Sequence, residues 1–248
     1  MVSKLGRWSA VALGWMLVAL AVAQERVAVD AQNAPFMYAD GERAAGVYPA
    51  LLQAGFHHIG VAVRIEALPW SRALAGLDQA ELGVGGIYKN SERVQKYDYS
   101  APIFVEKLVL YVRRDKRLVF TGMQDLAGLR IGVIRGWSYG DAFDLARRAG
   151  RVETEEVASD AQNFSKLESK RLDAIVAVEQ AGTAQLASGH YPSVIALQTP
   201  LAVNPTHLAF HKSADKRALL ARFDSAIEAM RRSGEHDRLV GRALLKQP

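Results

Sequence analysis

Residues 85–103 bring an arginine, two glycines and several hydroxyl groups close together in the segment GGIYKNSERVQKYDYSAPI. The guanidinium of Arg93 can bind a carboxylate through two parallel, charge-assisted hydrogen bonds. Gly86 lets a ligand approach the backbone N–H groups, because glycine has no Cβ. The two residues are a candidate anion site at the end of a strand, although an arginine in a polar turn is, taken alone, more typical of a solvated surface.

A second candidate anion site is the turn GWSYG at residues 136–140, which follows the apolar run LRIGVI and precedes a helical pattern. A strand, a glycine turn and a helix together present a helix N-terminus, whose free N–H groups attract anions. Ser138 would either complete this site or serve only as the N-cap of the helix. Trp137 and Tyr139 would either stack on a ligand or cover the connection between two lobes.

Four more residues are candidate ligand contacts because they stand where an element begins or ends. Asp30, Asn33 and Phe36 follow the first apolar strand, and Trp70 stands beside Pro69 at the start of a helix. Aromatic residues at helical spacing usually belong to a core. That explanation is weaker for Trp70, because it lies at the boundary of its element.

The sequence predicts no catalytic residue, metal site or cofactor. His207 and His211 are four residues apart in an expected strand, roughly 13 Å in extended chain, which is too far for one metal ion. The segment GVGG at 83–86 lacks the third glycine of a dinucleotide fingerprint, and no nucleophile elbow, P-loop or HExxH is present. Cysteine is absent, which excludes disulfides and thiol chemistry. A pair of carboxylates brought together by the fold remains the enzymatic alternative.

Residues 1–23 are expected to be a signal peptide. Lys4 and Arg7 precede a 16-residue apolar stretch that is shorter than the roughly 20 residues of a membrane span, the alternative interpretation. Cleavage after Ala23 would leave Gln24 first and lower the net charge from +5 to +3, because the segment holds two basic residues and no acidic one. This mild charge gives little support to nucleic-acid binding. We expect a soluble protein exported to a bacterial periplasm, without the cysteine that carries a lipid anchor.

Short β-rich runs alternate with helical patterns along the chain, which is typical of a parallel-sheet α/β protein. Strands are expected at 26–31, 61–68, 81–87, 106–114, 129–134, 152–157, 172–178 and 206–212, and helices from 46 to 53 and over 69–77, 138–150, 159–171 and 213–233. Ser159 and Gln162 have the spacing of a capping box. The segments 121–128 and 199–205 are expected to be connectors.

The strands and helices form two similar series, one before about residue 105 and one after about residue 125. We therefore expect two α/β lobes, with residues 24–107 and 208–248 in the first and residues 108–207 in the second. A cleft between two lobes is a favoured site for a small ligand.

Five segments in order resemble the family 3 extracellular solute-binding proteins, which serve polar amino-acid ABC importers. They are VDAQNAPFMYADGERAAG at 29–46, the opening segment at 85–103, DLAGLRIGVIRGWSYGD at 125–141, LESKRLDAIVAVEQ at 167–180 and SGEHDRL at 233–239. The resemblance covers nearly the whole chain after residue 23. It implies a two-lobe periplasmic-binding-protein fold of type II, which closes on its ligand by a hinge motion.

The resemblance also assigns roles to individual residues. Arg93 falls on the arginine that binds the ligand carboxylate, Ser138 on the hydroxyl site of the second lobe and Gly86 on a backbone contact. Asp30, Asn33 and Trp70 fall where the family lines its side-chain pocket.

Three positions depart from the family pattern. Tyr88 replaces a hydroxyl-bearing residue five before the arginine, and Val178 replaces the acid that usually meets the α-amino group. Glu179 stands next to it and would substitute only if the strand end turned it inward. Residues 46–49 also lack the acidic residue that the family pattern has there. These departures leave the fold expectation intact and leave open whether the ligand is an α-amino acid.

We therefore expect a periplasmic binding protein, not an enzyme, that delivers a small carboxylate-bearing solute to an inner-membrane ABC permease. The protein is expected to be a monomer without nucleic-acid partners. Two alternatives stay open: an exported lyase or dehydratase acting on a small acid, and a ligand sensor that presents its closed form to a membrane receptor.

Overall fold

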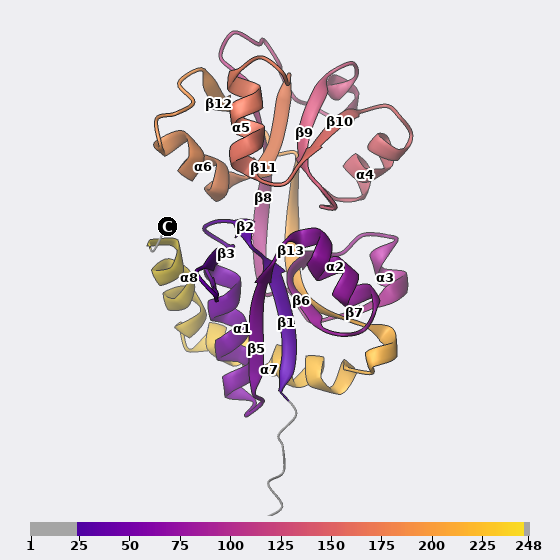
Figure 1. Cartoon of the computed structure of the whole chain (residues 1–248), viewed down its shortest axis with the longest axis vertical. Coiled ribbons are helices and arrows are strands. Elements are labelled where there is room, and N and C mark those ends of the chain that lie inside the picture. Colours follow the sequence, from indigo (N-terminus) through magenta and orange to yellow (C-terminus); the bar gives the residue numbers. More distant parts are fainter. Residues whose placement is uncertain (1–23, 246–248) are drawn as a thin grey trace, which may run out of the picture.

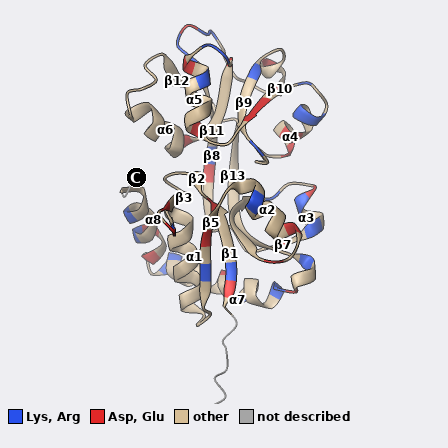
Figure 2. Ribbon diagram, viewed as in Figure 1, with Lys and Arg blue, Asp and Glu red and all other residues tan. Residues whose placement is uncertain are grey.

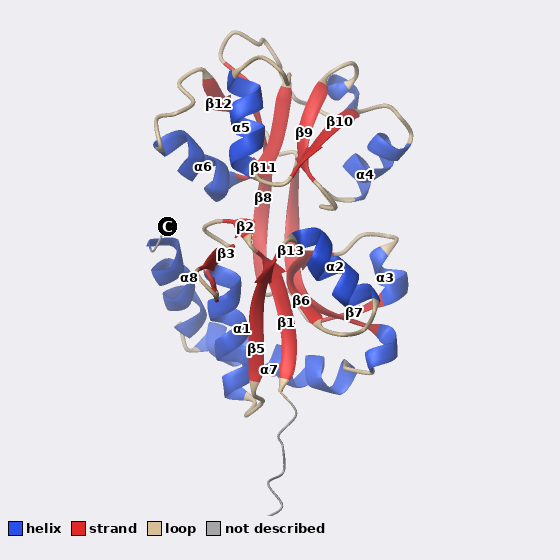
Figure 3. Cartoon of the chain, in the orientation of Figure 1, coloured by secondary structure: helices blue, strands red, loops and turns tan. Residues whose placement is uncertain are grey.

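A computed structural model describes residues 24–245 as an α/β protein of two lobes, shown one above the other in Figure 1. The expected signal peptide at 1–23 lies outside the described residues. Figure 3 shows that strands form the centre of each lobe and that helices cover them. No helix within residues 24–245 is long and apolar enough to cross a membrane.

The first lobe, at the bottom of Figure 1, is built on a parallel sheet. Its strands are β1 (Glu25–Asp30), β5 (Val63–Leu68) and β6 (Gly83–Tyr88), with β1 paired to both others. Its helices are α1 (Val47–His58), α2 (Trp70–Asp78), α3 (Arg93–Lys96), α7 (Arg217–Arg232) and α8 (Glu235–Leu245). The short strand β7 (Tyr97–Tyr99) pairs antiparallel with residues 209–211. The apolar run Val27–Val29 is fully buried, because helices cover both faces of the sheet.

The second lobe repeats this plan. Strands β9 (Arg130–Ile134), β10 (Glu153–Val157) and β11 (Ala174–Val178) form its sheet, with β9 parallel to both others and β10 at the edge. Helices α4 (Asp141–Arg148), α5 (Asp160–Glu168) and α6 (Glu179–Ala187) pack around it, with η1 (Met123–Leu126) and strand β12 (Val194–Ala196). Ser159 caps α5 by accepting a hydrogen bond from the N–H of Gln162, as its spacing predicts.

Two ten-residue strands, β8 (Phe104–Arg113) and β13 (Ala202–His211), run through both lobes and pair antiparallel between them. They join the two parallel sheets into one sheet with the order β10-β9-β11-β8-β13-β6-β1-β5. The expected lobe boundaries, after 107 and after 207, fall inside these two strands and remain a prediction.

Some local predictions were wrong. Residues 199–205 were expected to be a connector, but β13 begins at Ala202, because pairing with β8 outweighs the loop preference of Asn204 and Pro205. The long C-terminal helix starts at Arg217, after the short η2 (Lys212–Ala214). A small sheet of β2 (Gln32–Asn33), β3 (Met37–Asp40) and β4 (Arg43–Ala45) was not predicted, because its strands are too short to show a period.

In the view of Figure 2, Lys and Arg are spread over helices, strands and loops of both lobes, interspersed with Asp and Glu. This distribution agrees with the mild net charge of the sequence.

Gly86 provides a direct test of packing inside β6. Its φ of 76° lies in the left-handed region, and a Cβ would stand 2.7 Å from the ring of Tyr48 and 3.0 Å from Sδ of Met37. We predict that Gly86→Ala lowers the free energy of unfolding by about 2–4 kcal/mol, measured by urea denaturation. Gly41→Ala is the matched control, since its φ is 61° but its Cβ would meet nothing within 4 Å, so it should cost only about 1 kcal/mol. Equal costs would contradict the packing account.

Candidate functional site

Arg93 lies at the start of α3, directly after the turn that leaves β6. Its guanidinium donates hydrogen bonds to the carbonyl oxygen of Tyr88 at 3.3 Å and to that of Gly136, in the second lobe, at 3.0 Å. The backbone N–H of Arg93 donates to Oδ1 of Asn90 at 2.8 Å, which fixes the turn. Burial of the guanidinium lowers the pKa of Arg93. The predicted carboxylate anchor therefore faces the other lobe and bonds neutral oxygens.

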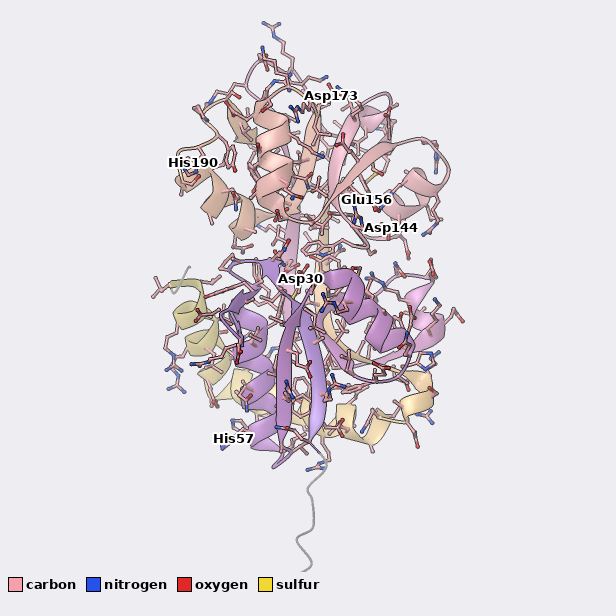
Figure 4. All side chains as sticks on the ribbon, in the orientation of Figure 1. Asp30, His57, Asp144, Glu156, Asp173 and His190 are labelled. Atoms are coloured by element: carbon pink, nitrogen blue, oxygen red, sulfur yellow. The ribbon has the colours of Figure 1, made fainter. Side chains whose placement is uncertain are left out.

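The glycine turn of the second lobe contacts the first lobe through the carbonyl oxygen of Gly136 and the indole of Trp137. The carbonyl oxygen of Gly136 also accepts the indole N–H of Trp70 at 3.1 Å. Trp137 donates its indole N–H to Oδ2 of Asp30 at 3.2 Å, across the lobe boundary. The two indole rings make an edge-to-face contact with centroids 6.3 Å apart. Figure 4 shows Asp30 at this boundary.

Two side chains in the turn do not have the local roles expected of them. Helix α4 begins at Asp141 with Gly140 as its N-cap, so the prediction of Ser138 as N-cap was wrong. Ser138 instead donates a hydrogen bond to the carboxylate of Asp144, whose other oxygen accepts the N–H of Tyr139 at 3.0 Å. Tyr139 is fully buried, and its hydroxyl accepts the N–H of Ile134 at 2.7 Å. The Asp144 carboxylate thus already accepts hydrogen bonds from the turn that was expected to bind an anion. The sequence did not point to Asp144.

A cavity between the lobes contains most of the predicted ligand contacts. It is lined by Met37, Trp70, Gly86, Tyr88, Arg93, Glu106, Trp137 and Ser138. The side chains leave space for about one water molecule. A solute of amino-acid size would therefore need the lining groups to move apart.

The remaining predicted contacts lie around this cavity or away from it. Asp30 borders it through Trp137, whereas Phe36 is a core residue with no exposed surface, packed on Tyr48 at 5.8 Å between ring centroids. Glu179, at the start of α6, is half-exposed, and its Oε2 lies 3.6 Å from Nζ of Lys107. Asn33 is 3% exposed, and neither atom of its amide has a hydrogen-bond partner within residues 24–245.

Glu106 was missed from the sequence. It lies on β8 and lines the cavity, and its carboxylate accepts hydrogen bonds from the hydroxyls of Tyr48 and Tyr88. Burial raises the pKa of Glu106 to about 7. The signal was available, because Glu106 has the same strand parity as Leu108, Leu110 and Val112, so the period of two assigns it to the buried face.

Asp160, at the start of α5, is a second buried acid that sequence reasoning took only as a helix residue. It is 7% exposed, and its Oδ1 has no hydrogen-bond partner in the described chain. Burial, together with the nearby charges of Asp30 and Glu106, raises its pKa to about 7. Burial likewise raises the pKa of Asp30 to about 6.

The family profile of the bacterial extracellular solute-binding proteins, family 3, matches residues 26–245. The chain belongs to this family. It is 26% identical over 121 residues to the L-cystine-binding protein TcyJ of Escherichia coli (strain K12), a match that covers 48% of this chain and 45% of the relative. The match thus spans less than half the length of that curated relative.

Solved structures of similar shape show the periplasmic-binding-protein fold, as predicted. A histidine kinase sensor domain similar to periplasmic binding proteins has a TM-score of 0.78 at 20% identity, covering 89% of this chain and 96% of its own. The arginine-, lysine-, histidine-binding protein ArtJ of Geobacillus stearothermophilus scores 0.75 at 21%, covering 91% and 97%. The ancestral amino acid-binding protein AncCDT-1, a precursor of cyclohexadienyl dehydratase, scores 0.72 at 21%, covering 89% and 95%. At these identities the likeness establishes the fold alone.

The buried acids make stability depend on pH. Because burial raises their pKa, the folded chain keeps protons that the unfolded chain has released, so the stability that these two groups contribute is full below about pH 4 and is lost as pH rises to about 7. We predict that Glu106→Gln flattens this fall by on the order of 1–3 kcal/mol between pH 5 and 8, measured by urea denaturation. Glu153→Gln, at an exposed position of β10, is the control and should follow the wild-type profile. An unchanged slope in Glu106→Gln would contradict the assignment.

Proposed function

We propose that the chain is a periplasmic binding protein that captures a small carboxylate-bearing solute and delivers it to an inner-membrane ABC importer. The observation that carries this proposal is the guanidinium of Arg93, which lies in the cavity wall between the lobes. Within residues 24–245 it donates hydrogen bonds to carbonyl oxygens, at 3.3 and 3.0 Å. A ligand carboxylate would neutralise the positive charge of the guanidinium, which carbonyl oxygens cannot do, and would accept two parallel hydrogen bonds from it.

Capture requires the lobes to separate and close again, because the cavity in this conformation is too small for such a solute. The crossing strands β8 and β13 are the natural hinge, since they alone belong to both lobes within the sheet order of the described chain. In an open form, Arg93 and Trp70 would release the carbonyl of Gly136, and the solute would take its place.

The periplasmic location is part of the same proposal. Family membership supports an extracytoplasmic role, and residues 1–23 have the charge and apolar length of a cleaved signal peptide. Fractionation of expressing cells tests it, since recovery of the protein in the cytoplasm would contradict export. We also expect the mature protein to bind its solute as a monomer.

A lyase acting on a small acid is the second candidate. Glu106 supplies the cleft carboxyl that such a reaction would need, with a pKa raised by burial to about 7, and it lines the same cavity as Arg93. Mass spectrometry of a bound solute after incubation separates the two functions, because a binding protein returns its solute unchanged. A sensor role differs in its partner, and a pull-down with the solute-loaded protein distinguishes a permease from a receptor.

We predict that Arg93→Ala weakens binding of a carboxylate-bearing solute at least about 30-fold, because two charge-assisted bonds are lost. Calorimetry on a solute found by a thermal-shift panel of amino acids and organic acids measures the effect, since a bound solute raises apparent stability. Arg93→Lys should recover only part of the affinity, because an ammonium lacks the planar fork.

Lys96→Ala is the matched control, one turn further along α3, where the side chain is 48% exposed. It should stay within about two-fold of the wild type, as its ion pairs are weak surface contacts. If Arg93→Ala binds as tightly as this control, the carboxylate anchor is wrong.

A further inference from the structure

Two asparagine side chains next to the cavity between the lobes have hydrogen-bonding atoms without a partner. Asn33, on β2 of the first lobe, is 3% exposed, and neither its Nδ2 nor its Oδ1 has a partner within residues 24–245. Asn204, on the crossing strand β13, has a buried Nδ2 that also lacks a partner in the described chain. Because a buried polar atom without a hydrogen bond is costly, a ligand group that supplies the missing bonds would bind favourably here.

The pairing of two short strands directs the amide of Asn33 towards the cavity. Asn33 pairs with Met37 across β2 and β3, and directly paired residues of antiparallel strands project on the same face. Met37 lines the cavity, and its Sδ would lie 3.0 Å from a Cβ built on Gly86, which lines it too. Asn33 therefore offers the cavity one donor group and one acceptor.

Asn204 lies where the crossing strands meet the glycine turn of the second lobe. It pairs directly with Glu106 across β8 and β13, so both side chains project on the same face of the sheet, and Glu106 lines the cavity. A Cβ built on Gly140 would stand 3.5 Å from Oδ1 and 3.6 Å from Nδ2 of Asn204. Gly140 belongs to the same turn as Trp137 and Ser138, which also line the cavity. The N–H groups of Asn204 are thus a second unused donor at this place.

The carboxyl groups of Glu106 and Asp30 at the cavity already accept hydrogen bonds. Glu106 accepts two tyrosine hydroxyls, and Asp30 accepts the indole N–H of Trp137 at 3.2 Å. Burial raises the pKa of both carboxyls, which favours their uncharged forms. Val178, which replaces the acid that usually meets an α-amino group, is fully buried. The cavity therefore offers uncharged amides, rather than a free carboxylate, to the part of a solute that lies away from Arg93.

A carboxamide matches the unused donors and the unused acceptor. Its carbonyl oxygen has two lone pairs, which can accept hydrogen bonds from Nδ2 of Asn33 and Nδ2 of Asn204, and its N–H₂ group can donate to Oδ1 of Asn33. A second carboxylate has no donor for that oxygen, and an ammonium has no acceptor for the two Nδ2 groups. A site whose buried polar groups stay unpaired with the wrong ligand discriminates strongly against that ligand.

We propose that the solute is a carboxylate with an uncharged carboxamide and no ammonium group, and that Asn33 and Asn204 bind the carboxamide while Arg93 binds the carboxylate. This proposal rests on the proposed function and narrows its solute class to the monoamides of small dicarboxylic acids. Asn33 belongs to the first lobe and Asn204 to a strand that both lobes share. A carboxamide bound to both would therefore favour the closed form.

The test uses the full-length chain in calorimetric titrations with two monoamides, succinamate and glutaramate, which differ by one methylene group. Each has three matched probes of the same chain length. The dicarboxylates succinate and glutarate lack the donor, the methyl ketones 4-oxopentanoate and 5-oxohexanoate lack it without adding a charge, and L-asparagine and L-glutamine add an α-ammonium. We expect one monoamide to bind at least about 10-fold more tightly than each of its three matched probes.

Variants test the two asparagines separately. Asn33→Leu nearly keeps the volume of the side chain and removes the amide, so it should weaken the monoamide at least about 10-fold and abolish its advantage over the methyl ketone. Asn204→Ala should weaken the monoamide and the ketone alike, because both offer it a carbonyl oxygen. Asn163→Leu is the matched control, since Asn163 is fully buried with both amide atoms unpartnered within residues 24–245 but lies on α5 against Gly132. It should bind the monoamide within about two-fold of the wild type.

If Asn33→Leu and Asn204→Ala bind the monoamide within two-fold of Asn163→Leu, the proposal is overturned. It is equally overturned if a dicarboxylate or an amino acid binds the wild type more tightly than its matched monoamide. If no monoamide binds while another small carboxylate does, and Arg93→Ala abolishes that binding, the carboxamide proposal fails and the proposed function stands. If no small carboxylate binds the wild type, both fail.

Discussion

Charged side chains enclosed between the two lobes constrain the rest of this structure, because each loses water when the lobes meet and must find another partner. Arg93 finds carbonyl oxygens of Tyr88 and Gly136, and Asp30 finds the indole N–H of Trp137. Such bonds are worth more in a low-dielectric cleft than in water, and an unpaired charge there costs more. The glycine turn at 136–140 connects the lobes, because the carbonyl oxygen of Gly136 and the indole N–H of Trp137 form hydrogen bonds with residues of the first lobe.

The crossing strands make this arrangement possible. β8 and β13 pair with each other and with strands of both lobes, so the lobes share one sheet while their helices stay separate. Glu106 lies at this crossing, fixed by tyrosines from α1 and β6. Burial raises the pKa of this carboxyl to about 7 at the point where the sheets of the two lobes join.

Much of the fold was predictable from the sequence, because buried parallel strands and amphipathic helices leave periodic patterns. The parallel sheets, the cap at Ser159 and the two-lobe fold follow from such patterns or from the family resemblance. The small sheet β2–β4 and helix α6 were missed, since short strands and a helix without a one-sided apolar face carry no period.

The ligand contacts remain a prediction, and the structure brings only some of those residues together. Six of the predicted contacts line one cavity, but Phe36 and Tyr139 are packed in cores and Glu179 pairs with Lys107. Asp160 was missed because its burial near Asp30 and Glu106 depends on contacts between residues more than 50 positions apart, which local sequence does not reveal. Glu106 was missed although its place on the buried face of β8 follows from the period of two.

The central claim is that the space between Trp70 and Trp137 is where the solute binds. The sequence has four tryptophans, and once Trp8 and Trp15 are replaced by Phe, the remaining two lie one in each lobe with rings 6.3 Å apart. Intrinsic fluorescence of this variant, titrated with a solute whose binding calorimetry has established, reports directly on that space. The account predicts a saturable change in intensity and emission maximum, with a midpoint equal to the calorimetric Kd. An emission spectrum that stays unchanged while the protein becomes saturated would contradict it.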